Sequence, residues 1–272
     1  MTIEAEPIGL IAGSGRLPVL FAQAAARAGL RVVAAAHEGE TDPALEQHVA
    51  AFRWVKLGQL GKIVDLLRGA GCVQAVLCGG ITKVRLFDVR PDLLGLKVLA
   101  GLRSFGDDAA LRAIAAALEG GGVKIVSPLP LVPELLAPRG PIGKKKLTED
   151  QRSDAQVGAL AARSLGALDL GQTVVVKRGV VLAVEAVEGT DACIARGGLL
   201  ARGSGHGPVV VKVPKPGQDT RFDVPAVGPR TIESLSAAGC SALVIEAGTT
   251  LILDRPELIA LADAAGIAVE GL

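Results

Sequence analysis

The stretch IGLIAGSGRLPVLFAQAAARAGLRVVAAA, residues 8–36, predicts a strand, a helix and a second strand in succession. Residues 8–12 and 31–36 are short apolar runs of the length of buried strands, and 17–29 has helical spacing of its apolar residues. Gly29 stands where helices commonly end in a left-handed turn. This order predicts two parallel strands joined by a right-handed crossover.

The alternation continues along the chain and then breaks. Further strands are predicted at 52–56, 73–79 and 123–127, and helical segments at 44–50, 59–71 and 88–119. Glycine, proline and lysine in 133–147 indicate a linker. The predicted fold class is α/β, with a Rossmann-like N-terminal domain with a parallel sheet over 1–132. A second α/β domain is predicted over 148–272.

Composition excludes several classes of protein. A chain of 272 residues with 50% hydrophobic residues is globular, and a net charge of +1 argues against a nucleic-acid partner. The four cysteines form no C-x-x-C pair, so neither a zinc site nor a disulfide framework is expected. The first residues do not have the pattern of a signal peptide, and no apolar run has membrane-spanning length. We therefore expect a cytoplasmic protein.

The loop GSG, residues 13–15, joins the first predicted strand to the first predicted helix. Gly13, Ser14 and Gly15 would let backbone N–H groups approach an anion at the helix N-terminus. Pro18 stands where a dinucleotide-binding loop has its third glycine, although Glu38 follows the second strand, where a ribose-binding acid would lie. A tight turn without a ligand is the alternative.

A second loop, GGITKVR at 79–85, follows another predicted strand of the same sheet. Its Thr82 and Lys83 would lie at the carboxyl edge, where open α/β sheets bind their ligands. An ordinary connecting loop is the alternative.

A charged loop lies within VVVKVPKPGQDTRFDVPAVGPRTI, residues 209–232. Asp219 and Asp223 stand there beside Lys215 and Arg221, among glycine and proline residues that restrict the backbone. Carboxylates bind hard cations such as Mg²⁺, and Lys or Arg offsets charge on phosphate oxygens. A solvated surface loop with loosely paired charges is the alternative.

A second acidic cluster follows an apolar run that ends at Val184. Glu185, Glu188 and Asp191 are spaced three apart around a turn at Gly189, where a helix is expected to begin. Thr190 or Asp191 could cap that helix, which is the alternative to a role in binding. Together with the charged loop, these residues could supply the one or two carboxylates that Mg²⁺ usually takes from a protein.

These motifs carry a family resemblance. LAVEAVEGTDACI and KPGQDTRFDVPAVGPRTI, with IGLIAGSGRLP and GGITK, resemble the LpxI type of UDP-2,3-diacylglucosamine pyrophosphatase. The resemblance extends from about residue 8 to the C-terminus. It implies Mg²⁺-dependent hydrolysis of UDP-2,3-diacylglucosamine to UMP and 2,3-diacylglucosamine 1-phosphate (lipid X), in lipid A biosynthesis of Gram-negative bacteria.

The resemblance and the chemistry of the residues together assign roles. Asp223, Asp219, Lys215 and Arg221 are the expected catalytic residues, and Mg²⁺, with Mn²⁺ as a substitute, is expected on residues drawn from Asp223, Asp219, Glu185, Glu188 and Asp191. Substrate contacts are assigned to Gly13, Ser14, Gly15, Thr82, Lys83 and Thr190. The domain 1–132 is therefore expected to bind the nucleotide and the domain 148–272 to be catalytic, with the ligand in the cleft between the two domains.

The expected partners are the acylated UDP-sugar and its lipid product. Transient contact with the inner-membrane surface and a homo-oligomer are further expectations. Two rival classes stay open, a dinucleotide-dependent oxidoreductase and a non-catalytic protein that binds a nucleotide-sugar or lipid.

Overall fold

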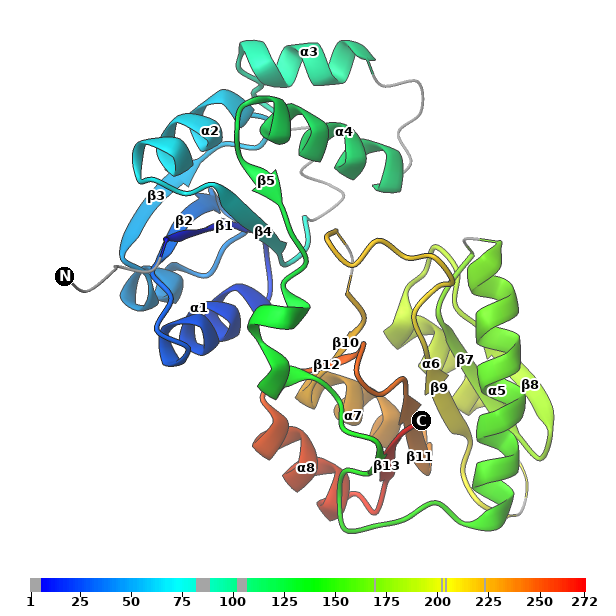
Figure 1. Ribbon diagram of the computed structural model, residues 1–272. Helices are drawn as coiled ribbons and strands as arrows, with labels where there is room; N and C mark the ends of the chain where they lie inside the picture. The colour runs from blue at the N-terminus through cyan, green and yellow to red at the C-terminus, as the bar shows by residue number, and fades with distance from the viewer. Residues whose placement is uncertain are drawn as a thin grey trace. The chain divides into compact units, whose positions relative to one another are not determined.

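A computed structural model describes residues 6–81, 89–101, 107–168, 170–201, 203, 205–222 and 224–272, with the backbone alone for 107–109. Its contacts divide the chain into two compact units. The first is Met1–Glu134 with Asp219–Phe222, and the second is Leu135–Gln218 with Asp223–Leu272. Both are α/β, which confirms the predicted fold class (Figure 1).

The first unit is built on a parallel sheet with the strand order β3-β2-β1-β4-β5. The strands are β1 (Ile8–Ala12), β2 (Val32–His37), β3 (Ala51–Val55), β4 (Gln74–Cys78) and β5 (Lys124–Ile125). The chain runs outward from β1 to β3 and then returns to the other side of β1. This reversal is the arrangement of Rossmann-like nucleotide-binding sheets, as the alternation of strands and helices predicted.

Helices cover both faces of this sheet. The helical elements are α1 (Leu17–Arg27), η1 (Pro43–His48), α2 (Leu60–Gly69), α3 (Leu93–Gly101), α4 (Asp107–Gly120), η3 (Leu129–Leu131) and η4 (Pro133–Leu135). Ile11, Val33 and Ala75 share a buried cluster with α2 and α4. Successive strand residues point to opposite faces, so the intervening residues of β1 and β2 face the side on which α1 lies (Figure 1).

The second unit has a six-stranded sheet of order β6-β13-β11-β9-β7-β8 and a small pair, β10-β12. The strands are β6 (Gly140–Pro141), β7 (Thr173–Lys177), β8 (Val180–Val184), β9 (Val209–Lys212), β10 (Ala226–Val227), β11 (Ala242–Ile245), β12 (Leu251–Ile252) and β13 (Ala268–Gly271). The neighbours β13, β11 and β9 are parallel, and the remaining pairings in the large sheet are antiparallel. The sheet is therefore mixed.

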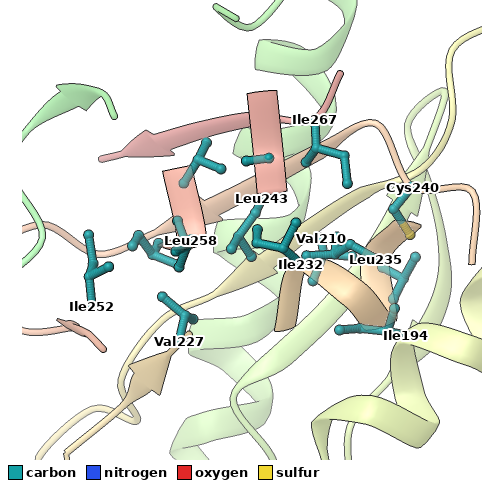
Figure 2. Close-up of a cluster of buried hydrophobic side chains, with 14 of the residues drawn as sticks. Ile194, Val210, Val227, Ile232, Leu235, Cys240, Leu243, Ile252, Leu258 and Ile267 are labelled. Carbon is teal, nitrogen blue, oxygen red and sulfur yellow. The ribbon is translucent and has the colours of Figure 1, made fainter. Parts of the chain in front are cut away.

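Four helices enclose the larger sheet: α5 (Glu149–Ala167), α6 (Thr190–Leu200), α7 (Pro229–Ala237) and α8 (Arg255–Ala264). Val209 and Val211 face α5, whereas Val210 faces the opposite side. There it joins Ile194, Leu235 and other residues of α6, α7 and α8 in the cluster drawn in Figure 2. The alternation of β9 thus builds two cores from one apolar run.

Local sequence accounts for several features of the second unit. Thr148 caps α5 through its side chain, and Gln151 accepts a bond in return from the Thr148 backbone N–H, which completes a capping box. β7 and β8 form a hairpin around Lys177-Arg178-Gly179. Residues 133–147, interpreted as a linker, contain η4 and the edge strand β6, which pairs with β13.

Candidate functional site

The charged loop lies between β9 and β10, and its best-defined pair is Asp219 with Arg221. The guanidinium Nε and Nη2 donate to the two carboxylate oxygens at 3.0 and 2.8 Å, and the Arg221 backbone N–H donates to Oδ1 at 3.1 Å. The Arg221 hydrogen bonds hold the pKa of the Asp219 carboxyl below its usual value. Arg221 Nη1 also lies 3.4 Å from Glu119 Oε1. Asp219 is therefore an ionised carboxylate that orients a guanidinium.

Of the other two predicted residues of this loop, the structure describes Lys215 but not Asp223. The Lys215 backbone N–H donates to Gln218 Oε1 at 3.0 Å, which closes a short turn at the start of the loop. Phe222 packs against the apolar core of the first unit, to which residues Asp219–Phe222 belong. Asp223 lies outside the described residues.

A buried polar cluster forms where β8, α6 and β9 meet in the second unit. Thr190 donates its hydroxyl hydrogen to Glu185 Oε1 at 2.7 Å and accepts a bond from Lys212 Nζ at 3.3 Å. Thr173 Oγ1 lies 3.5 Å from the same hydroxyl. Glu185 and Lys212 are each only 9% exposed. A threonine hydroxyl thus bridges a buried carboxylate and a buried ammonium group.

Lys212 also fastens the base of the charged loop. It is the last residue of β9, and its Nζ donates at 3.2 Å to the carbonyl of Ala226, the first residue of β10. One side chain therefore joins both ends of the loop to the Glu185–Thr190 pair. From sequence, Lys212 was one of the four cations of the stretch 209–232, without a specific role. A lysine at the end of the apolar run 209–211 was the available signal, because buried lysines are rare unless paired.

The remaining two acidic candidates lie apart from this cluster and have partners of their own. Glu188 pairs with Arg196 at 2.6 Å, and hydrogen bonds from its own backbone and from Arg196 lower its pKa. Asp191 accepts a bond from Ser234 at 3.0 Å and lies 3.8 Å from Arg230. Of the predicted acids that the structure describes, only Glu185 joins the Thr190 network.

The described residues do not form a metal site by themselves. Over the part of the chain that the structure describes, no three His, Cys, Asp or Glu side chains gather closely enough to hold an ion. Mg²⁺ commonly takes only one or two carboxylates and completes its shell with water and substrate phosphate. The oxygen donors of this chain fit an ion held in that way, and do not fit an ion enclosed by Glu185, Glu188 and Asp191 together.

The glycine loop of the first unit is joined to the loop after β4. Ser14 N–H donates to the Gly80 carbonyl at 2.7 Å, Gly80 N–H returns a bond at 3.2 Å, and Ser14 Oγ donates to the same carbonyl at 3.0 Å. A Cβ atom on Gly13 would lie 2.3 Å from that carbonyl oxygen. Close approach of two backbones therefore requires glycine at position 13.

This pairing bears on the predicted anion site. The N–H groups of Gly13 and Ser14 donate to the carbonyls of Cys78 and Gly80. Gly15 has a φ of +89°, and nothing lies within 4 Å of the position that a Cβ atom would take there. Two of the amides expected to face an anion are thus already occupied. Thr82 and Lys83 lie outside the described residues.

The cysteines are buried core residues. All four are free thiols, and burial raises their pKa values, that of Cys72 to about 11 and those of Cys193 and Cys240 to about 12. A thiolate nucleophile is therefore not favoured at any of these positions. Among the described helices, none is both long and apolar enough to cross a bilayer.

Comparisons with known proteins agree with the motifs. Residues 7–135 match the model of the LpxI N-terminal domain, and residues 138–270 match that of the LpxI C-terminal domain. UDP-2,3-diacylglucosamine pyrophosphatase LpxI of Caulobacter vibrioides is 37% identical over 273 residues, with 97% of each chain covered. N5-carboxyaminoimidazole ribonucleotide synthetase from Thermotoga maritima aligns over 68% of this chain and 42% of its own, at 15% identity and a TM-score of 0.27, which carries no argument. The two domain models and the relative together show that the chain belongs to the LpxI family.

Proposed function

We propose that this chain hydrolyses the diphosphate of UDP-2,3-diacylglucosamine to UMP and 2,3-diacylglucosamine 1-phosphate in lipid A biosynthesis. The observation that carries the proposal is the 37% identity with an LpxI pyrophosphatase across 97% of both chains. The charged loop between β9 and β10 supplies the groups that cleavage of a phosphoric anhydride needs, namely carboxylates beside cations.

The residues of the charged loop have separate roles in this proposal. Asp219 uses both carboxylate oxygens on Arg221, so its role in this proposal is to aim that guanidinium at a phosphate oxygen. Lys215 adds a second positive charge, and Asp223 positions the attacking water. Lys212 keeps the loop closed at its base through the Ala226 carbonyl. Among these groups, the Arg221 guanidinium is already oriented by Asp219 to meet transition-state charge on the phosphoryl oxygens.

Mg²⁺, or Mn²⁺ in its place, is the cofactor that we propose. It would be held by Asp223 with water and substrate phosphate, and Glu185, the carboxylate of the buried polar cluster, is the described candidate for a second oxygen ligand. When bound, such an ion withdraws charge from the bridging and terminal phosphate oxygens. The donor set is made of oxygens, which favours Mg²⁺ or Mn²⁺ over zinc.

Exposed leucines on α3 support binding of the acyl chains. Leu93, Leu96 and Leu99 are 80%, 51% and 38% exposed, and their spacing of three places them on one side of the helix. Leu94 and Val98 of the same helix pack against the core of the first unit. One side of α3 therefore packs on the core, and the other side exposes apolar side chains that an acyl chain could contact. Leu102, which the sequence places after this series, lies outside the described residues.

The remaining expectations are part of the same proposal. An acylated substrate and product bring the enzyme into transient contact with the inner-membrane surface from the cytoplasm, and nucleic acid is not a partner. A homo-oligomer and the position of the ligand in a cleft between the domains stay predictions.

Release of UMP from purified UDP-2,3-diacylglucosamine tests the proposal. The wild type should form UMP and 2,3-diacylglucosamine 1-phosphate in equal amounts, and Asp223→Ala should not. Asp65→Ala, at an exposed position of α2, is the matched control and should keep full activity. A wild-type protein that releases no UMP contradicts the proposed reaction.

A further inference from the structure

His37 is a buried histidine at the carboxyl end of β2 in the first unit. Its residue surface is 8% exposed, and its Nδ1 lies 2.9 Å from the carbonyl oxygen of Ala12, the last residue of β1. Thr41 supports the arrangement, because its hydroxyl donates to the same carbonyl at 2.7 Å and accepts the His37 backbone N–H at 3.0 Å. The imidazole is thus held in one orientation beside the residue that precedes the glycine loop.

The hydrogen bonds of the ring determine its tautomer. A carbonyl oxygen can only accept, so Nδ1 carries the hydrogen that it donates to Ala12. Burial lowers the pKa of His37, and the ring is therefore neutral at physiological pH. In a neutral imidazole protonated at Nδ1, Nε2 has a lone pair and is a hydrogen-bond acceptor.

This acceptor has no partner within the described part of the protein. Nδ1 is the ring atom for which a hydrogen bond is found, and Nε2 is not among the fully enclosed side-chain atoms that lack one. A fixed lone pair that the fold does not use is available to a donor group of a ligand.

The place of His37 in the sheet indicates which ligand group this is. In a sheet of order 3-2-1-4-5, ligands bind outside the carboxyl ends of the strands, and an acceptor after the second strand receives the ribose hydroxyl of a bound nucleotide. Glu38, the residue that sequence alone suggested for this role, is exposed, and its backbone N–H donates to Val55 of β3. The buried and oriented acceptor at this edge is the preceding residue.

We propose that Nε2 of His37 accepts a hydrogen bond from a ribose hydroxyl of the uridine nucleotide, and so selects ribonucleotides. The inference rests on the proposed function, because a UDP-sugar substrate supplies the ribose. His37 is a specificity residue here, and no step of the phosphate chemistry passes through it.

Two substitutions separate ligand recognition from a structural role. The amide of His37→Asn can replace the Nδ1–H donor to Ala12 while it removes the acceptor at the Nε2 position. His37→Gln places an amide oxygen near the Nε2 position and gives up the bond to Ala12. Recognition of ribose predicts that the Gln variant keeps nucleotide affinity better than the Asn variant, and a purely structural role predicts the reverse.

The experiment is calorimetric titration of the full-length protein with UMP and with 2′,3′-dideoxyuridine 5′-monophosphate. The wild type should bind UMP about five- to tenfold more tightly than the dideoxy nucleotide, the effect of one neutral hydrogen bond. His37→Asn should bind both nucleotides with the same affinity. His48→Asn is the control, since His48 contacts Gln23 and should leave the preference unchanged.

Equal affinity of the wild type for the two nucleotides overturns the inference, and so does a preference that survives in His37→Asn. The comparison of the two nucleotides on the wild type needs no variant, so the inference can be refuted even if a variant folds poorly. Turnover of UDP-2,3-diacylglucosamine by the wild type is measured on the same preparation. If the protein hydrolyses UDP-2,3-diacylglucosamine but shows no preference for UMP, the inference about His37 is wrong and the proposed function stands. If the protein does not hydrolyse the substrate, the proposed function itself is wrong.

Discussion

Thr190→Val keeps the shape of its side chain and removes the hydroxyl that joins Glu185 to Lys212. That hydroxyl donates to Glu185 at 2.7 Å and accepts from Lys212 at 3.3 Å. A hydrogen bond to a charged group contributes about 1.5–3 kcal/mol. Because Thr190 is half-buried and the Lys212 bond is long, we expect a loss of about 2 kcal/mol in the free energy of unfolding of the second unit.

The cluster should loosen without unfolding. Glu185 keeps a bond from the Gln172 backbone N–H at 3.3 Å, and Lys212 keeps the Ala226 carbonyl. A loss of about 2 kcal/mol lowers the Tm of a unit of this size by roughly 5–10 °C. Differential scanning calorimetry measures this shift, with Thr190→Ser as the control that retains the hydroxyl and gives up one methyl group.

Turnover of the same two variants separates support of the loop from substrate contact. If Thr190 acts through Lys212 on the charged loop, the valine variant should melt earlier and show a lower kcat, and the serine variant should recover both. A valine variant that melts with the wild type, or a serine variant that falls as far as valine, would refute the role of the hydroxyl bridge. A raised KM with unchanged Tm would point to direct contact with substrate.

Three further predictions concern chemistry, pH and lipid. Asp223→Ala should lower kcat by several orders of magnitude while the circular dichroism spectrum is unchanged, and chelation by EDTA should stop wild-type turnover until Mg²⁺ or Mn²⁺, but not zinc, is added back. His37 has a pKa below its ordinary 6.5 because of burial, so the unfolded chain binds the proton first as pH falls. The contribution of His37 to the free energy of unfolding, measured by urea denaturation, should be fully present above pH 6.5 and lost as pH falls through the pKa of the folded state. The free energy of unfolding should therefore decline less steeply with falling pH in His37→Asn. Acylated substrate should have a higher kcat/KM than UDP-glucosamine, and Leu96→Asp should narrow that difference; equal values for the two substrates would exclude acyl binding.

The parallel sheet of the first unit was predictable because its strands are contiguous apolar runs separated by helical segments. Strands β6 and β13 of the second unit were not predictable in this way. β13 has only four residues and includes Glu270, which the fold buries against Arg152 at 2.6 Å. β6 is Gly140–Pro141, whose composition is typical of a linker, and it pairs only at the edge of the sheet. Tertiary pairing determined both strands, and local sequence did not.

The candidate site shows a similar division. Glu185 and Thr190 are separated by one turn at the start of α6, so their proximity follows from sequence spacing. Lys212 comes from a strand that neighbours them only in the folded sheet. In the first unit, the glycine pattern at 13–15 indicated a tight turn but not its cause, which is the approach of Gly80 from the loop after β4. Contacts between distant segments require the fold.

The most direct test of the proposed function is mass-balanced turnover of UDP-2,3-diacylglucosamine by the purified protein with Mg²⁺. The proposal predicts that UMP and 2,3-diacylglucosamine 1-phosphate appear in a one-to-one ratio, that EDTA stops the reaction, and that Asp223→Ala abolishes it while Asp65→Ala does not. Intact substrate after prolonged incubation with well-folded wild-type protein, or products other than these two, would contradict it.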